Sequence, residues 1–370
     1  MSRKIFGALV YAVVLIVLVL AVEGAYSVMR WSRLDRSIIY DAYRMVVPEP
    51  QAAATDGGLP IATREQIEAL LPAMQAAGAG MGNVPYKDEL VNDRAAINLV
   101  GEDGCLAPKP DVSKYTTYIR TADFDRFDPP SLFFDRDAEL SPALREFVDT
   151  YGVHLSEFTT LPTTERLTLP VVESDRKILV AGDSVAVGSM IGDAQTIASQ
   201  MQQRNAQAQY VNLGVNGASG ADIICQLEKA AARYSGQIVR ILYVYCENDF
   251  EPNGKFSTPE EVVAWLKEFA TANGNVPVTI VYAPYIYNII PHLTRFPGSR
   301  GATRETFPDE RRRLIDLAAA AGFDFVDIGD VAAEEARLRQ TDFAIFALFI
   351  DHLHLSEYGV SRLIERLPVN

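Results

Sequence analysis

Residues 177–188 read KILVAGDSVAVG, a short apolar run that ends in Gly-Asp-Ser and continues into small residues. Lys177–Ala181 has the length and composition of a buried strand, and Gly182 marks its end. A serine at a sharp strand-to-helix turn, here Ser184, exposes its hydroxyl and lies near the positive end of the next helix. The stretch therefore predicts a strand that presents a nucleophile, although the same residues would also suit a serine N-cap beside a turn-forming aspartate.

Four further apolar runs follow, and segments with helical periodicity separate them. Strands buried on both faces with helices between them are typical of a parallel sheet. We therefore expect residues 175–370 to form a three-layer α/β/α sandwich around a five-stranded parallel sheet, with ligands beyond the carboxyl ends of the strands. The other expected strands are Gln209–Leu213, Ile238–Tyr245, Val278–Tyr282 and Phe323–Val326, and the expected helices are Val187–Arg204, Ala221–Arg233, Pro259–Ala272 and Asp309–Ala321.

A glycine and an asparagine follow the second and third expected strands. Gly217 lies in a glycine-rich turn, where a bare backbone N–H can approach a ligand closely. Asn248 can donate a hydrogen bond from its side chain to a developing oxyanion without changing its charge. Each residue alone would be ordinary turn chemistry, and the glycine pattern is not the G-x-G-x-x-G of a dinucleotide site.

Two of the four histidines lie together near the C-terminus, in Asp351-His352-Leu353-His354, before a closing helix that Ser356 could cap. Asp351, three residues ahead of His354, can hold one ring nitrogen while the other faces Ser184. The alternative is a metal site made by Asp351, His352 and His354. Histidines two residues apart in a short loop with no fourth ligand candidate argue against it, so we predict no metal.

These blocks, in this order, resemble the SGNH hydrolases, also called GDSL-type esterases and lipases, from Lys177 to Leu367. The resemblance implies that Ser184 is the nucleophile, that His354 is the base oriented by Asp351, and that no cofactor is required. It also implies an oxyanion hole formed by Ser184, Gly217 and Asn248. The chain departs from the family at Cys246, where the third block usually has glycine. A side chain there could crowd the loop of Asn248; Cys246 as an alternative nucleophile would need a nearby base.

The N-terminal residues predict a membrane anchor. Ile5–Val22 is an uncharged apolar run of eighteen residues, close to the length of a spanning helix. Basic residues precede the run and the first charge after it is acidic, so we expect a single-pass protein with a cytoplasmic N-terminus and a periplasmic or extracellular body. Val22-Glu23-Gly24 resembles a weak cleavage site, which leaves a secreted form open.

The segment from Arg30 to Ser174 is irregular by pattern, and we expect a spacer and an accessory region that packs on the main domain. Only Arg64–Ala76 and Ser141–Tyr151 have helical periodicity there. The predicted organisation is thus an anchor over 1–29, the spacer and accessory region over 30–174, and the hydrolase-like domain over 175–370. Three cysteines allow at most one internal disulfide, and the sequence does not decide which two would pair.

Two functions fit these features. The first is a serine esterase or O-acyltransferase acting on O-acyl, principally acetyl, groups of envelope glycan or lipid outside the cytoplasm. The second is an inactive hydrolase-like subunit with a binding or structural role in a membrane protein complex. The formal charge of −14 disfavours nucleic acid as a partner. The long aromatic stretch from Tyr282 to Gly301 could line a substrate groove or pack under a lid.

Overall fold

The computed structural model describes residues 55–56, 59–82, 90–120, 130–250, 256, 258–289, 308–340 and 347–368. Ala62–Thr294 and Thr306–Asn370 form one compact unit; in the other unit, only the short antiparallel pair β1 (Thr55–Asp56) and β2 (Leu59–Pro60) is described as secondary structure. The predicted anchor, Ile5–Val22, lies outside the described residues. Every described helix falls short of the length and apolarity that a membrane span requires.

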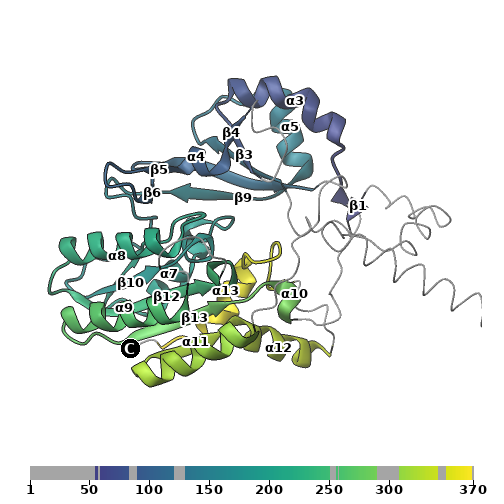
Figure 1. The fold of residues 1–370 in the computed structure, drawn as a ribbon. Coiled ribbons are helices and arrows are strands. Elements are labelled where there is room, and N and C mark those ends of the chain that lie inside the picture. Colours follow the sequence, from purple (N-terminus) through teal and green to yellow (C-terminus); the bar gives the residue numbers. More distant parts are fainter. Residues whose placement is uncertain are drawn as a thin grey trace, which may run out of the picture. The chain divides into compact units, whose positions relative to one another are not determined.

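The predicted sheet is confirmed. Five strands pair in parallel in the order β11-β10-β12-β13-β14 (Figure 1), so their carboxyl ends meet at one edge. Their bounds are within one residue of those expected from the sequence. The strands are β10 (Lys177–Ala181), β11 (Gln209–Asn212), β12 (Ile238–Cys246), β13 (Val278–Ala283) and β14 (Asp324–Asp327).

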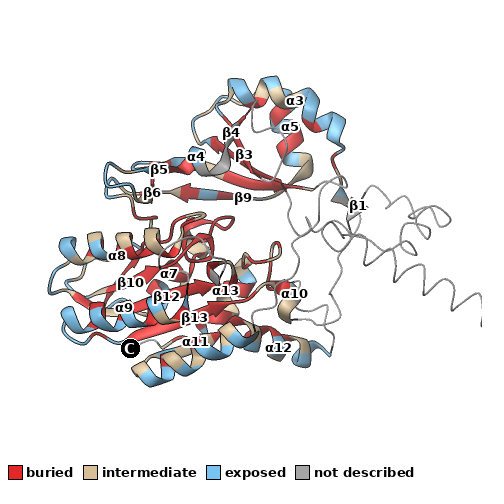
Figure 2. Cartoon of the chain, in the orientation of Figure 1, coloured by how far each residue is buried: buried red, intermediate tan, exposed pale blue. Residues whose placement is uncertain are grey.

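The three layers are confirmed by two separate hydrophobic cores. Ile178 and Val180 of β10 belong to one core, whereas Leu179 belongs to the other, because successive strand side chains point to opposite faces. Helices α7, α12 and α13 contribute to the first core, and α8, α9 and α11 to the second. Figure 2 shows the buried strands between helices whose outer sides are exposed. The helices are α7 (Ile197–Arg204), α8 (Gly220–Arg233), α9 (Pro259–Ala272), α11 (Pro308–Ala321), α12 (Ile328–Arg339) and α13 (Glu357–Ile364).

One predicted helix is wrong. The stretch Val187–Arg204 is not continuous: α6 (Ser184–Val187) ends at Gly188, which adopts the left-handed φ of 73° that favours glycine. A short 3-10 turn, η1 (Asp193–Gln195), follows, and α7 begins after Thr196, whose hydroxyl accepts a hydrogen bond from the Ser199 N–H. Helix α12 was not predicted, whereas the expected cap of α13 by Ser356 is confirmed.

The accessory region is not irregular, which corrects the prediction. Its described residues form a second five-stranded sheet of mixed direction, in the order β4-β3-β8-β7-β9. The predicted helix Arg64–Ala76 is confirmed as α3, and Ser141–Tyr151 becomes α5, capped by Ser141. Side chains of α3 and α5 form a core with this sheet. The elements are α3, α4 (Asp93–Ile97), α5 (Pro142–Tyr151), β3 (Gly80–Gly82), β4 (Val91–Asn92), β7 (Ser113–Ile119), β8 (Ser131–Asp135) and β9 (Gly152–Thr159).

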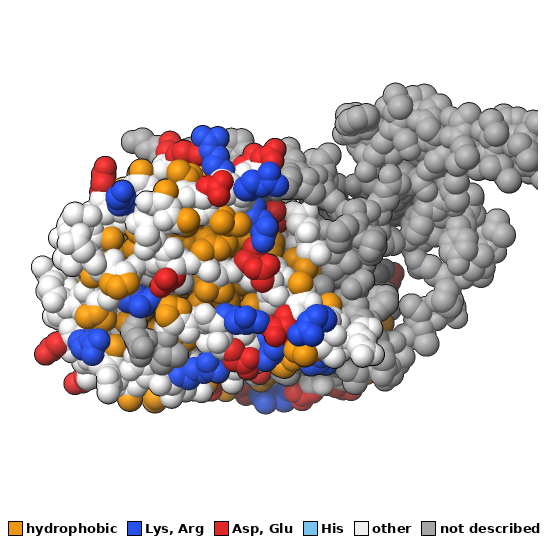
Figure 3. All heavy atoms as spheres, turned by 90° about the horizontal axis from the view of Figure 1, so that it is seen from below, with side chains coloured by type: hydrophobic (Ala, Val, Ile, Leu, Met, Phe, Trp, Pro, Cys, Tyr) orange, Lys and Arg blue, Asp and Glu red, His pale blue; other side chains and the backbone are white. Residues whose placement is uncertain are grey.

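The face on the side of α11 and α12 carries basic and acidic side chains beside one another, with hydrophobic side chains between them (Figure 3). Ion pairs join Arg313 of α11 to Glu260 of α9 and Arg366 to Glu334 of α12. Exposed pairs of this kind contribute at most about 1 kcal/mol each. The stability of this region therefore comes mainly from the buried side of its helices.

Candidate active site

Ser184 begins α6 directly after β10, and close packing fixes the turn. A Cβ at Gly182 would lie 2.8 Å from the Cβ of Ala186, and one at Gly214 would lie 2.1 Å from the backbone nitrogen of Val187. Neither position has room for a side chain. Asp183 caps the helix, since its Oδ1 accepts a hydrogen bond from the Val185 N–H at 3.0 Å.

The structure brings together the three residues predicted as the catalytic group. Nε2 of His354 lies 2.7 Å from Oγ of Ser184, and Nδ1 of His354 lies 2.5 Å from Oδ2 of Asp351. The other carboxylate oxygen of Asp351 accepts hydrogen bonds from the N–H groups of Leu353 and His354 at 2.8 and 2.7 Å. The imidazole is therefore held between an acid and a hydroxyl, in the arrangement that proton transfer from Ser184 requires.

Asp351 is only 1% exposed. Burial acts to raise the pKa of its carboxyl group, but the charge and hydrogen bond of His354 outweigh burial and hold the pKa below the ordinary aspartate value. Asp351 therefore stays ionised and favours the tautomer of His354 that carries its proton on Nδ1 and leaves Nε2 free to accept one.

The predicted oxyanion donors lie on three neighbouring strand ends. Ser184 is the first residue of α6, so its N–H has no acceptor within the helix. Gly217 follows β11 with a positive φ of 69°. Asn248 lies in the 3-10 turn η2 (Glu247–Phe250) after β12, and its Nδ2 donates to Oδ2 of Asp183 at 3.2 Å. Because an amide nitrogen has two hydrogens, that bond orients the group and leaves a second donor.

Cys246 packs beneath the site rather than facing it. Its side chain is fully buried, and its sulfur lies 2.9 Å from Oδ1 of Asp183, the carboxylate that also accepts from Asn248. Burial, then the negative charges of Asp183 and Asp249, raise the pKa of the Cys246 thiol well above its ordinary value. The thiol is therefore protonated at neutral pH, which argues against the alternative of a cysteine nucleophile.

Arg166 was not predicted from the sequence, and it holds the loop after the nucleophile. Its side chain is fully buried, and its guanidinium donates to the carbonyl oxygens of Val187 and Ile191, each at 2.6 Å, and to that of Gly188. Nε of the same side chain pairs with Oδ1 of Asp193 at 3.2 Å. Its partners are mostly backbone groups more than twenty residues away, so no local pattern marks Arg166 as important.

The accessory sheet also contacts the site. The hydroxyl of Tyr118, on β7, donates to the carbonyl oxygen of Met190 at 2.7 Å. Burial raises the pKa of the Tyr118 hydroxyl well above its ordinary value, and the negative charge of Asp351 raises it further. The expected packing of the accessory region on the main domain is thus observed, and it reaches the loop between α6 and α7.

Glu247 anchors the segment after β13. Its carboxylate accepts from the Tyr282 hydroxyl at 3.1 Å and from the Tyr285 N–H at 2.6 Å, next to the short helix α10 (Ile286–Ile289). The ring of Tyr285 packs on that of His352 with a centroid distance of 5.5 Å. Residues 290–301 of the aromatic stretch lie outside the described part of the chain.

The metal alternative does not fit the geometry. Both ring nitrogens of His354 are already engaged by Ser184 and Asp351. Among described residues, the potential ligands that cluster closely are Asp103, Cys105 and Cys225, but the two sulfurs are joined in a disulfide. A disulfide sulfur is not the thiolate that binds metal.

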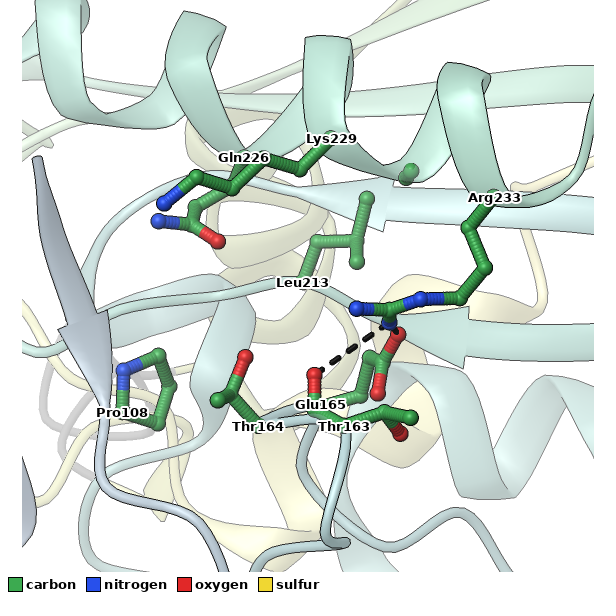
Figure 4. Close-up of a pocket in the computed structure, with 9 residues that line it drawn as sticks. Pro108, Thr163, Thr164, Glu165, Leu213, Gln226, Lys229 and Arg233 are labelled. Atoms are coloured by element: carbon green, nitrogen blue, oxygen red, sulfur yellow. Dashed lines mark hydrogen bonds and ion pairs between the residues drawn. The ribbon is translucent and has the colours of Figure 1, made fainter. Parts of the chain in front are cut away.

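A small hollow lies beside α8, away from the catalytic group (Figure 4). Gln226, Lys229 and Arg233 project into it from the helix, and none of the three residues of the catalytic group lines it. Arg233 spans it to pair with the buried carboxylate of Glu165 and to donate to the carbonyl of Thr163 at 3.2 Å. The hollow lies between α8 and the segment that leads to β10.

No family model and no curated protein matches the chain. Solved structures do resemble it over about half its length. A lipolytic G-D-S-L family member from Veillonella parvula is 16% identical with a TM-score of 0.38 and covers 51% of this chain and 94% of its own. An acetyl-xylooligosaccharide esterase from Geobacillus is 19% identical with a TM-score of 0.37 and covers 52% and 93%. A carbohydrate acetylesterase family member from Sinorhizobium meliloti is 19% identical with a TM-score of 0.33 and covers 52% and 94%.

Proposed function

We propose that the chain is a serine esterase or O-acyltransferase that acts outside the cytoplasm on O-acyl groups, principally acetyl groups, of envelope glycan or lipid. The observation that carries this proposal is the hydrogen-bonded series from Ser184 through His354 to Asp351. It needs no metal or cofactor, because a base and a nucleophile in contact suffice for acyl transfer.

The reaction proceeds through an acyl-enzyme. Oγ of Ser184 attacks the ester carbonyl while its proton passes to Nε2 of His354, and Asp351 stabilises the imidazolium that forms. The N–H groups of Ser184 and Gly217 and the amide of Asn248 stabilise the oxyanion. The alcohol leaves with the proton from His354. Water or a sugar hydroxyl then attacks the acyl group while its proton passes to Nε2 of His354, and Oγ of Ser184 leaves and takes that proton back, which gives hydrolysis or transfer respectively.

The extracytoplasmic location is part of the proposal. The disulfide between Cys105 and Cys225 supports it, because disulfides persist in oxidising compartments and are rare in the cytosol. The apolar run Ile5–Val22 serves as the anchor, with the N-terminus in the cytoplasm and the body in the periplasm or outside the cell. The partners are then an acylated carbohydrate or lipid substrate and the membrane, and a membrane protein complex is a further candidate.

The test uses the full chain in detergent with p-nitrophenyl acetate and with acetylated oligosaccharides. Wild type should release acetate, and Ser184→Ala should reduce the rate by about 10⁶-fold, to the background of the assay. Mass analysis in the presence of free acceptor sugars separates transfer from hydrolysis. A folded wild-type protein without activity on any ester would instead favour a binding or structural subunit.

A further inference from the structure

The loop made by β5 (Asn98–Val100) and β6 (Leu106–Pro108), called here the β5–β6 hairpin, is joined to α8 by a disulfide, by hydrogen bonds and by an ion pair between Asp103 and Lys229 at 2.7 Å. Cys105 forms the disulfide with Cys225 of the helix. The backbone of Leu106 donates to Oδ1 of Asp222 at 2.9 Å and accepts from Nε2 of Gln226 at 2.8 Å. The hairpin therefore has a fixed position over the first half of α8.

This position places Asn98 against the turn that carries the oxyanion donor. The side chain of Asn98 is buried, with the residue 5% exposed, and its Nδ2 donates to the carbonyl oxygen of Asn216 at 2.7 Å. That carbonyl belongs to the peptide group whose nitrogen is the N–H of Gly217. The contact is thus one peptide bond away from the group expected to bind the oxyanion.

A trans peptide group directs its C=O and its N–H to opposite sides. The only cis peptide bond among the described residues is Leu169–Pro170, so the group between Asn216 and Gly217 is trans. A hydrogen bond that holds the carbonyl on one side consequently fixes the direction of the N–H on the other. It also polarises the group, which strengthens the N–H as a donor. A hydrogen bond from the Ala218 N–H to the Val215 carbonyl at 3.2 Å closes the turn, but Gly217, with a positive φ and no side chain, leaves the central peptide group able to rotate within it.

We propose that Asn98 is a positioning residue for the oxyanion hole, acting through the Asn216–Gly217 peptide group. The inference rests on the proposed esterase function, and it makes the accessory region a working part of the catalytic site. A neutral amide suits this position because it donates to the carbonyl without adding a charge near the oxyanion. An ionised carboxylate would have no hydrogen to donate, so the substitution Asn98→Asp removes the hydrogen bond while keeping the shape of the side chain.

The test measures steady-state hydrolysis of p-nitrophenyl acetate by the full chain in detergent. Asn98→Asp and Asn98→Ala should each lower kcat by on the order of tenfold to a hundredfold, since complete loss of an oxyanion donor costs about 10² to 10³. KM should change less than about twofold, because ground-state binding does not use this donor. The inhibition constant of phenylboronic acid, which mimics the tetrahedral intermediate, should rise by a factor similar to the loss in kcat/KM.

Val100→Ala is the matched control, because Val100 lies on the same strand and the residue is 67% exposed. Thermal unfolding identifies any variant that fails to fold. If Asn98→Asp does not fold, Asn98→Ala is used for the test instead. Folded Asn98 variants with the kcat and boronate affinity of Val100→Ala would overturn the role of Asn98 alone. A wild-type chain with no hydrolysis would overturn it together with the proposed function.

Discussion

Replacing Arg166 tests how the loop after the nucleophile is held. Arg166→Met keeps an unbranched apolar stem but removes the guanidinium, which donates to at least three backbone carbonyls and pairs with Asp193. Breaking a buried ion pair costs about 3 to 5 kcal/mol. Asp193 retains the Thr159 N–H at 3.0 Å and Arg136 at 3.4 Å, which limits that part of the cost. The orphaned carbonyls add to it, so we expect the free energy of unfolding to fall by about 3 to 5 kcal/mol.

The assay is urea unfolding at pH 7 followed by circular dichroism, with hydrolysis of p-nitrophenyl acetate measured in parallel. Arg64→Gln is the control, because Arg64 forms an exposed pair with Glu68 whose loss should cost about 0.5 kcal/mol or less. Arg166→Lys keeps the charge but not the planar set of donors, so its loss of stability should lie between those of Arg166→Met and Arg64→Gln. Activity of Arg166→Met should drop at least about tenfold because the loop begins at the nucleophile's helix. If Arg166→Met is destabilised no more than Arg64→Gln, Arg166 does not hold the loop after the nucleophile.

Three further predictions concern the acid, the thiols and a buried carboxyl group. Asp351→Asn should lower the esterase rate by about 10⁴-fold with little change in folding, and a loss below about tenfold would show that the carboxylate does not orient the base. Without reductant, iodoacetamide should label no cysteine in the folded chain and only Cys246 after unfolding; a second or third labelled thiol in the unfolded chain would contradict the disulfide between Cys105 and Cys225. Burial raises the pKa of Glu247 in the folded chain. The contribution of Glu247 to the free energy of unfolding is therefore greatest below the ordinary glutamate pKa and falls as the pH rises through the pKa of the folded state. The unfolding temperature of wild type minus that of Glu247→Gln should therefore fall as the pH rises from about 4 to about 8, and a difference that stays constant or grows would contradict this sign.

The main sheet was predictable because its signals are local. Each strand of the hydrolase-like domain is a short apolar run bounded by turn residues, as in Lys177–Ala181, and such runs identify buried strands without knowledge of distant contacts. The position of Ser184 follows from the same signals, since it comes directly after a strand of the parallel sheet. Asp351 and His354 were predicted instead from their spacing in a loop before the closing helix.

Other features depend on contacts that the sequence does not display. The strands of the accessory sheet include polar residues without a regular alternation, as in Ser113–Ile119, so their pairing comes from tertiary contacts rather than periodicity. The break at Gly188 was missed because apolar residues continue on both sides of it. Arg166 and Asn98 act on backbone carbonyls far along the chain, and such partners leave no pattern in the sequence.

Site-resolved labelling with a fluorophosphonate probe tests the central claim most directly, because the probe phosphonylates a serine only when a base has activated it. The full chain in detergent should take up one probe, located by mass spectrometry on Ser184. The uptake should be lost in Ser184→Ala and strongly slowed in His354→Ala. A well-folded wild-type chain that takes up no probe, or one labelled equally with and without His354, would contradict the proposed catalytic group.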